Sequence, residues 1–155
     1  RNANSGRPGR ARRCFLRLQT HNKTHLLHNV KMKNILVIGA TGQIGSELTM
    51  KLRGIYGNDP LFADDSSAAP KGELLESGPA EIVDVTNGAQ IAEVVKKHNV
   101  DAIYNLAALL SVVAEGRPQL AWKIGNDGLW NVLDVARAHN CAVFTPSSIG
   151  SFGPE

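Results

Sequence analysis

The stretch that decides the fold is Asn34-Ile35-Leu36-Val37-Ile38-Gly39-Ala40-Thr41-Gly42-Gln43-Ile44-Gly45. It opens as an apolar run rich in β-branched residues, a pattern typical of a strand buried on both faces of a parallel sheet. The three glycines that follow have separate expected roles. Gly39 permits a sharp exit from the strand, Gly42 lets the backbone approach a ligand, and Gly45 lets the next helix pack close to the strand.

The start of that helix offers a place for a phosphate group. Unpaired N–H groups and the positive end of the helix dipole both favour an anion there. Glycine-rich turns are common, so the context decides: here a predicted strand precedes the glycines and a helical pattern follows them. The stretch therefore predicts a dinucleotide-binding turn rather than a plain strand–turn–helix connection.

Composition and charge are those of an ordinary globular domain. The chain has 155 residues, of which 43% are hydrophobic and 20% are charged, enough for one domain with a proper core. Residues 1–31 contain eight Lys or Arg and no acid, which leaves nine bases against fourteen acids in residues 32–155. Because the predicted domain is acidic, the basic balance of the whole chain is no argument for nucleic-acid binding.

Cysteines and hydropathy point to no further class of site. Cys14 and Cys141 form neither a disulfide framework nor a metal-binding spacing, and a reducing compartment is the simplest interpretation. No apolar run approaches the roughly 18 residues of a membrane span. We therefore expect no metal, no nucleic-acid partner and no membrane partner.

Residues 1–31 are predicted to be a disordered basic extension, with the domain over 32–155. Two explanations of the extension remain open. The segment around residues 10–18 is similar to a mitochondrial targeting sequence, which would place the protein in mitochondria. Alternatively Met32, two residues before the first strand, is the true start, and the protein is cytoplasmic; this second explanation is favoured.

The pattern after the glycines alternates between helices and strands. The first helix is expected to turn Ile44, Leu48, Leu52 and Ile55 inward and to stop at 57–60. Strands are expected at 61–63, 80–85, 101–107 and 141–145, the first of them ending in Asp64 and Asp65, and a loop is expected over 66–79. One helix is marked by Ile91, Val94 and Val95 and is closed by 96–98. A long helix is expected to begin at Pro118, with an apolar side formed by Leu120, Ile124, Val132, Leu133 and Ala136. This order predicts an α/β fold, a Rossmann-like doubly wound parallel sheet truncated after its fifth strand.

An acid at the end of the second strand is the next element of such a site. Asp65 lies twenty residues beyond Gly45 and Asp64 is its neighbour. A carboxylate there can accept hydrogen bonds from both ribose hydroxyls and repels a 2′-phosphate. No Lys or Arg follows until Lys71, so NAD is predicted rather than NADP.

At this point the chain resembles the extended short-chain dehydrogenases/reductases, the NAD-dependent epimerase/dehydratase family, and more closely the L-threonine 3-dehydrogenases among them. The resemblance extends over 33–155, about half of a family enzyme. The residues that carry it are Gly39-Ala40-Thr41-Gly42-Gln43-Ile44-Gly45, Asp84-Val85, Leu106-Ala107-Ala108-Leu109-Leu110-Ser111, Asn131-Val132-Leu133-Asp134-Val135-Ala136 and Pro146-Ser147-Ser148-Ile149-Gly150-Ser151-Phe152-Gly153-Pro154.

The resemblance implies a role for each matching residue. Gly39 belongs to the cofactor turn, and Gly42, Gln43 and Ile44 would hold the pyrophosphate. Asp65 would bind the adenine ribose, Asp84 and Val85 the adenine, and Leu106, Ala107 and Ala108 the far ribose. Ser148 would be the catalytic serine that binds the substrate hydroxyl, with Ser111 beside it as a substrate contact.

The function implied is that of an NAD-dependent oxidoreductase of threonine catabolism, which converts L-threonine and NAD to 2-amino-3-oxobutanoate and NADH. Its substrate is a small molecule, and the full-length parent is expected to be a homodimer. Two alternatives stay open: a nucleotide-sugar epimerase or dehydratase, and a catalytically dead NAD-binding module.

The sequence departs from the family pattern at the catalytic base. The family uses a Tyr-x-x-x-Lys pair, in which the lysine lowers the pKa of the tyrosine. Here Tyr56 and Tyr104 are followed four residues later by Pro60 and Ala108. We therefore expect this chain to be inactive alone.

Other departures concern single positions. Gly125 stands where the family usually has an active-site asparagine, with Asn126 adjacent, and Asn105 stands where a histidine is frequent. His98 and His139 fall at predicted helix ends and are expected to be solvated.

Overall fold

The computed structural model describes residues 34–57, 61–64, 73–109 and 111–147. All its elements belong to the unit Met32–Glu155. The predicted extension over 1–31 lies outside the described residues, and disorder there stays a prediction.

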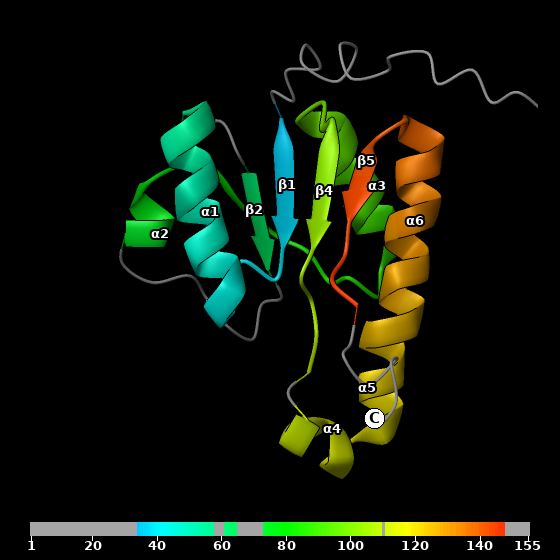
Figure 1. Ribbon diagram of the computed structural model, residues 1–155. Coiled ribbons are helices and arrows are strands. Elements are labelled where there is room, and N and C mark those ends of the chain that lie inside the picture. Colours follow the sequence, from blue (N-terminus) through cyan, green and yellow to red (C-terminus); the bar gives the residue numbers. More distant parts are fainter. Residues whose placement is uncertain (1–33, 58–60, 65–72, 110, 148–155) are drawn as a thin grey trace, which may run out of the picture. The chain divides into compact units, whose positions relative to one another are not determined.

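A five-stranded parallel sheet forms the centre of this unit (Figure 1). Its spatial order is β3-β2-β1-β4-β5. The strands are β1 (Ile35–Ile38), β2 (Leu61–Asp64), β3 (Ala80–Ile82), β4 (Ala102–Asn105) and β5 (Ala142–Phe144). The doubly wound topology predicted from the sequence is confirmed, although β3, β4 and β5 are shorter than expected.

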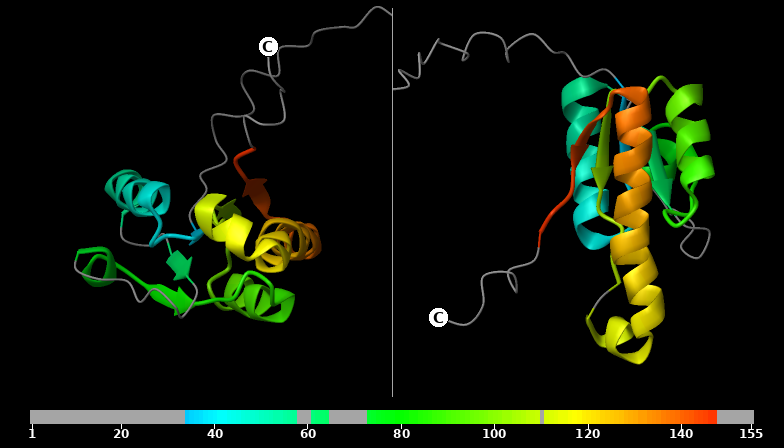
Figure 2. Two further views of the ribbon diagram at one scale, coloured as in Figure 1. Left: turned by 90° about the horizontal axis from the view of Figure 1, so that it is seen from below. Right: turned by 90° about the vertical axis from the view of Figure 1, so that its right-hand side faces the viewer.

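Helices cover both faces of the sheet. They are α1 (Gln43–Tyr56), α2 (Glu73–Glu76), α3 (Gly88–Lys97), α4 (Ser111–Gly116), α5 (Pro118–Trp122), the π-helical turn η2 (Lys123–Asp127) and α6 (Gly128–His139). Seen end-on, α1 lies on one face of the sheet and α3 and α6 lie on the other (Figure 2).

β1 is buried from both sides, as its apolar run predicts. Leu36 and Ile38 pack with α3 and α6, whereas Ile35 and Val37 pack on the α1 side. Each of the four side chains is at most 1% exposed. Since side chains alternate along a strand, only a run without polar breaks can serve two cores at once.

The inward stripe predicted for α1 is wrong in part. Leu52 is buried, but Ile44 and Ile55 are 69% and 60% exposed. The buried face instead contains Gly45 and Thr49. The helix makes its closest approach at Gly45, where no side chain intervenes, and Thr49 is satisfied because its hydroxyl donates to the carbonyl of Gly45 at 2.7 Å. The neighbouring isoleucines are therefore turned outward.

Three other element predictions need correction. α2 lies within the expected loop 66–79, and α4 has no counterpart among the predicted helices. The helix expected from Pro118 is divided by η2 into α5 and α6. On its apolar side Val132 and Ala136 are buried, but Leu120 and Leu133 are 38% and 45% exposed.

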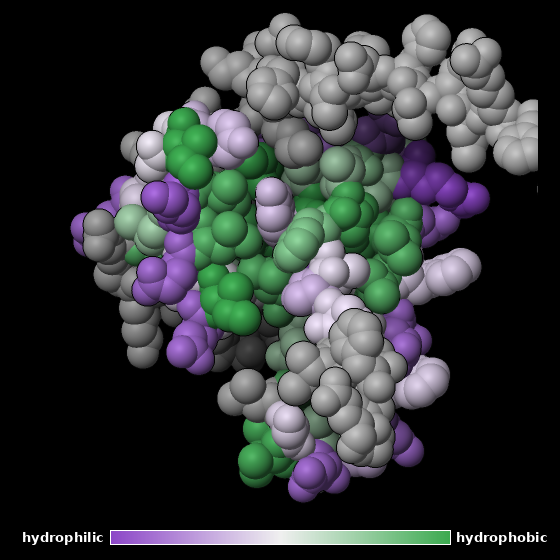
Figure 3. Space-filling view, in the orientation of Figure 1, coloured by the Kyte–Doolittle hydropathy of each residue, from purple (hydrophilic) through white to green (hydrophobic). Residues whose placement is uncertain are grey.

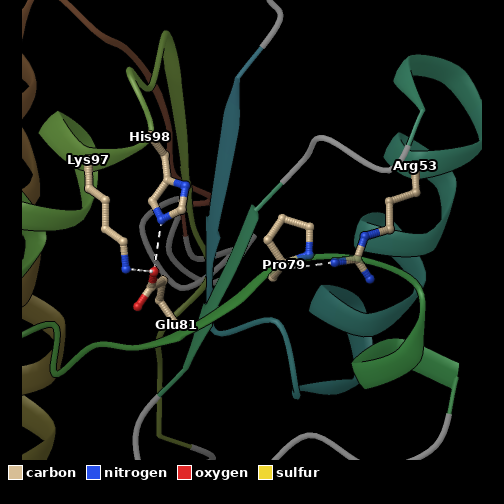
Figure 4. Close-up of polar contacts among 5 residues, drawn as sticks. All are labelled: Arg53, Pro79, Glu81, Lys97 and His98. Carbon is tan, nitrogen blue, oxygen red and sulfur yellow. Dashed lines mark hydrogen bonds and ion pairs between the residues drawn. The ribbon is translucent and has the colours of Figure 1, made fainter.

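A buried arginine ties α1 to the segment that leads into β3 (Figure 4). Arg53 is 5% exposed. Its Nη1 donates to the carbonyl of Leu74 at 2.8 Å and to the Ser77 hydroxyl, and its Nη2 donates to the carbonyl of Pro79 at 3.2 Å. Burial lowers the pKa of Arg53. These backbone acceptors allow the guanidinium to stay in the interior.

A second polar cluster joins β3 to the end of α3 (Figure 4). Oε1 of Glu81 lies 2.7 Å from Nζ of Lys97 and 2.8 Å from Nε2 of His98. The hydrogen bonds from Lys97 and His98 lower the pKa of Glu81, and the carboxylate raises the pKa of Lys97. His98 does cap α3 as expected, but its side chain is 27% exposed and paired, so the prediction that it is solvated is wrong.

On the α1 side, the described helices leave part of the sheet uncovered. None of the described helices packs over β4 and β5 there, and an apolar surface continues from α1 across the sheet (Figure 3). Phe144 is 52% exposed. Its ring lies 5.4 Å from that of Tyr104, centroid to centroid.

Candidate functional site

A cleft of about 230 Å³ opens at the carboxyl ends of the strands. It lies where the chain order reverses, since β1 has β2 on one side and β4 on the other. Ligands of doubly wound sheets bind at this switch point. The cleft is lined by Ile38, Gly39, Thr41, Gly42, Val83, Asp84, Val85, Leu106, Ala107, Ala108, Leu109 and Ile124.

The turn after β1 requires glycine at two positions. Gly39 has φ of 82°, and a Cβ there would lie 2.8 Å from the amide nitrogen of Ala107. At Gly45 a Cβ would lie 2.1 Å from the carbonyl oxygen of Gly39. Both distances are too short for a real side chain, so the backbone passes where any other residue would collide. The two backbone roles expected from the sequence agree with this geometry.

The N-cap residue of α1 lines this cleft, and no side chain caps the helix. Its N-cap residue is Gly42, which makes no side-chain cap, and the first turn contains no acid. The first amide groups of a helix have no intrahelical partners and carry the positive end of its dipole. Within 4 Å, a Cβ on Gly42 would meet only the carbonyl oxygen of Gly39, at 3.3 Å. These residues fit a dinucleotide pyrophosphate.

The wall formed after β3 is a hydrogen-bonded turn. Oδ1 of the exposed Asp84 accepts bonds from the amide and the hydroxyl of Thr86, both at 2.8 Å. The amide of Asp84 donates to Oε1 of Gln90 at 3.0 Å. Val85, 7% exposed, follows as part of the same wall.

The wall formed after β4 continues the pairing with β1. The amide of Leu106 donates to the carbonyl of Ile38 at 2.9 Å. Asn105 is 5% exposed, and its Oδ1 accepts a bond of 3.4 Å from the amide of Ala107. Asn105 therefore holds the start of this wall from inside the fold.

The cleft brings together most of the predicted cofactor residues. Gly39, Gly42, Asp84, Val85, Leu106, Ala107 and Ala108 all line it. Gln43 and Ile44 begin α1 but do not line the cleft, and the side chain of Ile44 points to solvent. A contribution of Ile44 to a ligand would therefore come from its backbone amide.

The geometry of the cleft does not test three of the predicted site residues. Asp65 and Ser148 lie outside the described residues. Ser111 is exposed at the start of α4 and does not line the cleft. Their proposed roles are not tested by the geometry.

Two of the residues that line the cleft, Thr41 and Ile124, were not predicted from the sequence as site residues. Thr41 lies inside the glycine motif, so its position could have indicated it. Ile124 comes from η2, and no periodicity in the sequence marks a π-helical turn. Such turns occur frequently at functional sites.

The described residues offer no candidate for a metal site or a membrane span. In the ranges that the structure describes, no three His, Cys, Asp or Glu side chains are grouped to hold a metal ion. No helix in those ranges is long and apolar enough to cross a membrane.

Comparison with known proteins identifies relatives of this fold and cleft. The model of the NAD dependent epimerase/dehydratase family matches residues 35–155. An uncharacterised epimerase/dehydratase of Staphylococcus saprophyticus is 48% identical over 124 residues, which are 80% of this chain and 39% of the relative. The chain thus spans well under half the length of this curated relative.

The chain is also similar to proteins of known structure. L-threonine dehydrogenase from Clostridium difficile is 46% identical with a TM-score of 0.72, over 77% of this chain and 37% of that protein. UDP-glucose 4-epimerase from Brucella ovis, in complex with NAD, is 25% identical with a TM-score of 0.68, over 79% of this chain and 38% of the epimerase.

Proposed function

This chain belongs to the NAD-dependent epimerase/dehydratase family, and we propose that it is the NAD-binding portion of an L-threonine 3-dehydrogenase. The family description agrees with the cofactor predicted from the glycine motif. The observation that carries the proposal is the turn in which Gly45 packs directly on the carbonyl of Gly39. This packing brings the uncapped start of α1 to the cleft, where it can receive a pyrophosphate.

The remaining cofactor contacts follow from the walls of the cleft. The backbone amides of Gly42, Gln43 and Ile44 would hold the pyrophosphate. The Asp84–Val85 wall would receive the adenine, and residues 106–108 would face the far ribose. Asp65 would accept hydrogen bonds from the adenine ribose, which favours NAD over NADP because a carboxylate repels a 2′-phosphate.

The substrate proposal rests on the relatives. Identity to the threonine dehydrogenase is far higher than identity to the epimerase. We therefore propose oxidation of L-threonine at its β-carbon to 2-amino-3-oxobutanoate, a step of threonine catabolism. Bound NAD supplies the hydride acceptor of this reaction. Ser148 would hold the hydroxyl that is oxidised, and Ser111 would contact the substrate.

The hydroxyl proton needs a base that this sequence does not provide. Neither Tyr56 nor Tyr104 has a lysine four residues later. A positioned base typically contributes about 10²–10⁴-fold to a rate. We propose that the chain binds NAD but does not turn over threonine, and that the longer parent does so, as a homodimer. The proposed compartment is the cytoplasm, or the mitochondrion if residues 1–31 act as a targeting segment.

The second candidate is a nucleotide-sugar epimerase or dehydratase, which the match to UDP-glucose 4-epimerase favours. It would use the same cleft and the same cofactor. The two candidates differ only in the substrate that reaches the nicotinamide end. A catalytically dead NAD-binding module is the remaining alternative.

Two proteins test the proposal: this chain, and a parent extended through the C-terminal half of the relatives. NAD binding is measured by calorimetry, and NADH formation with L-threonine by absorbance. We expect both proteins to bind NAD and only the extended one to form NADH. Turnover by the short chain would overturn the proposed base, and an extended protein that acts on a nucleotide sugar but not on threonine would establish the second candidate.

Adjacent serines provide a matched pair in the extended protein. Ser148→Ala should lower turnover while leaving NAD affinity nearly unchanged, since Ser148 is proposed to touch the substrate. Ser147→Ala should change neither quantity. Equal losses of turnover and NAD affinity in Ser148→Ala would assign Ser148 a structural role instead.

A further inference from the structure

The first turn of α6 stands directly behind the Asp84–Val85 wall of the cleft. At Gly128 a Cβ would lie 2.9 Å from Cγ1 of Val85, so the helix backbone touches that side chain. Three residues later, Nδ2 of Asn131 donates to the carbonyl oxygen of Val85 at 3.2 Å. Positions three apart share one face of a helix, and this face is therefore fitted to the wall.

Asn131 also covers the start of the next helix. Its Oδ1 lies 3.3 Å from the place that a Cβ on Gly88 would occupy. Gly88 is the first residue of α3, directly after the wall turn. The asparagine thus contacts the turn at its Val85 carbonyl and packs over the point where the turn becomes α3.

Among the residues that the structure describes, the other hydrogen bonds of this turn are local. Besides the bonds of Asp84 to Thr86 and Gln90, the amide of Asn87 donates to the carbonyl of Asp84 at 2.9 Å, and Oδ1 of Asn87 accepts from the amide of Gln90 at 3.3 Å. All of these lie within residues 84–90. They fix the shape of the turn but not its position relative to the rest of the cleft. The bond from Asn131 joins it to a helix 46 residues away in sequence.

A π-helical turn directly precedes α6. Lys123–Asp127 forms η2, and α6 starts at the next residue, Gly128. Ile124 in η2 lines the cleft, while Gly128 and Asn131 face Val85. A π-helical turn holds one residue more than an α-helical turn, which changes the face that the following helix presents.

We infer that Asn131 is a positioning residue for the cofactor: its side chain holds the Asp84–Val85 wall where it can receive the adenine of NAD. The inference rests on the NAD-binding role proposed above. Asn131 itself does not line the cleft, and it acts through the carbonyl of Val85. Loss of its bond leaves the local bonds of the turn intact but loosens its placement, which then depends on the packing of Val85 against Gly128. NAD must therefore fix the wall on binding.

The test uses this chain with two substitutions and one control. Asn131→Asp exchanges the donor for an acceptor that faces the Val85 carbonyl, and Asn131→Leu removes the bond while filling similar space. Asn126→Asp introduces the same charge in the exposed part of η2 and is the matched control. NAD affinity is measured by calorimetry well below the unfolding temperature, and amide hydrogen exchange is followed by NMR.

Both Asn131 variants should bind NAD about five- to tenfold more weakly, the effect of one lost hydrogen bond. Amide exchange should accelerate in residues 84–88 and stay as in the unsubstituted chain in β1 and β4. Asn126→Asp should change neither measurement. These results together distinguish positioning from a general contribution to stability.

Two results would overturn the inference. One is unchanged NAD affinity in both Asn131 variants. The other is faster exchange in β1 and β4 to the same degree as in 84–88, which would make Asn131 a general structural residue. Failure of the unsubstituted chain to bind NAD would instead refute the proposed function, and the inference with it.

Discussion

Gly45 of α1 packs against the carbonyl oxygen of Gly39 so closely that a Cβ would lie 2.1 Å from that oxygen and 2.8 Å from Cα of Ala40. The neighbours are backbone atoms, which cannot move aside as the end of a side chain can. The contact joins the exit of β1 to the first turn of α1. The shape of the turn and the position of the helix start therefore depend on each other.

Gly45→Ala should destabilise the fold by at least about 2 kcal/mol, because an added methyl group forces the helix away from the strand. NAD affinity should fall with it. Gly54→Ala is the control in the same helix, because nothing lies within 4 Å of a Cβ there. Since alanine favours the helix over glycine, this substitution should raise the free energy of unfolding by about 0.5–1 kcal/mol. Chemical denaturation measures both effects. Equal stability of the two variants would contradict the close packing.

Arg53→Met should lower the free energy of unfolding by about 2–4 kcal/mol, because the buried guanidinium no longer donates to the carbonyls of Leu74 and Pro79. The loss should be accompanied by faster amide exchange in 74–79. Arg137→Met is the matched control, since that side chain is 83% exposed in a pair with Asp134, and it should change stability by less than about 0.5 kcal/mol. Similar effects of the two substitutions would show that Arg53 does not anchor the segment.

Glu81→Gln should lower the free energy of unfolding by about 1 kcal/mol near pH 7. The pKa of Glu81 is lowered in the folded state from its ordinary 4.5. A depressed carboxyl pKa stabilises the fold above the unfolded value, and that contribution disappears as the pH falls through the folded value. The effect of the substitution should therefore vanish well below pH 4.5. Glu47→Gln, on the exposed side of α1, is the control and should change the free energy of unfolding by less than about 0.5 kcal/mol. A loss of stability for Glu81→Gln that is equal near pH 7 and well below pH 4.5 would refute the linkage.

Asp65→Asn should narrow the preference for NAD over NADP, since it removes a charge that repels the 2′-phosphate. Asp64→Asn, at the last residue of β2, is the adjacent comparison and should leave the preference unchanged. Affinities for both cofactors are measured for each variant. If Asp64→Asn alone narrows the preference, the ribose contact belongs to that residue, and if neither does, the proposed pose of the cofactor is wrong.

The sequence predicts best the features that neighbouring residues determine. β1 and the glycine turn could be predicted because an apolar run without breaks and the spacing of Gly39, Gly42 and Gly45 constrain the backbone locally. The alternation of elements then determined the doubly wound sheet. The same local reasoning failed for α1, where a buried glycine and Thr49, bonded within its own helix, replaced the expected isoleucines.

No pattern in the sequence predicts the long-range polar contacts. Nothing in the spacing of Arg53 pairs it with a carbonyl 21 residues away, and nothing pairs Asn131 with Val85. Such partners are chosen by the tertiary packing of whole elements. The division of the last helix by η2 could not be predicted either, because one extra residue in a turn leaves no gap in the apolar pattern of the sequence.

The central place of β1 has a consequence for the order of events during synthesis. Val37 pairs with Phe62 on one side and with Tyr104 on the other. The first of these partners leaves the ribosome early. The second belongs to a strand that begins far later, where Asn34 and Asp101 come into contact although they are 67 residues apart. Contacts of such long range form slowly, and an unpaired strand edge invites association with other chains. Among the strand edges that become paired in the described sheet, the edge of β1 that faces β4 thus stays open longest in the growing chain.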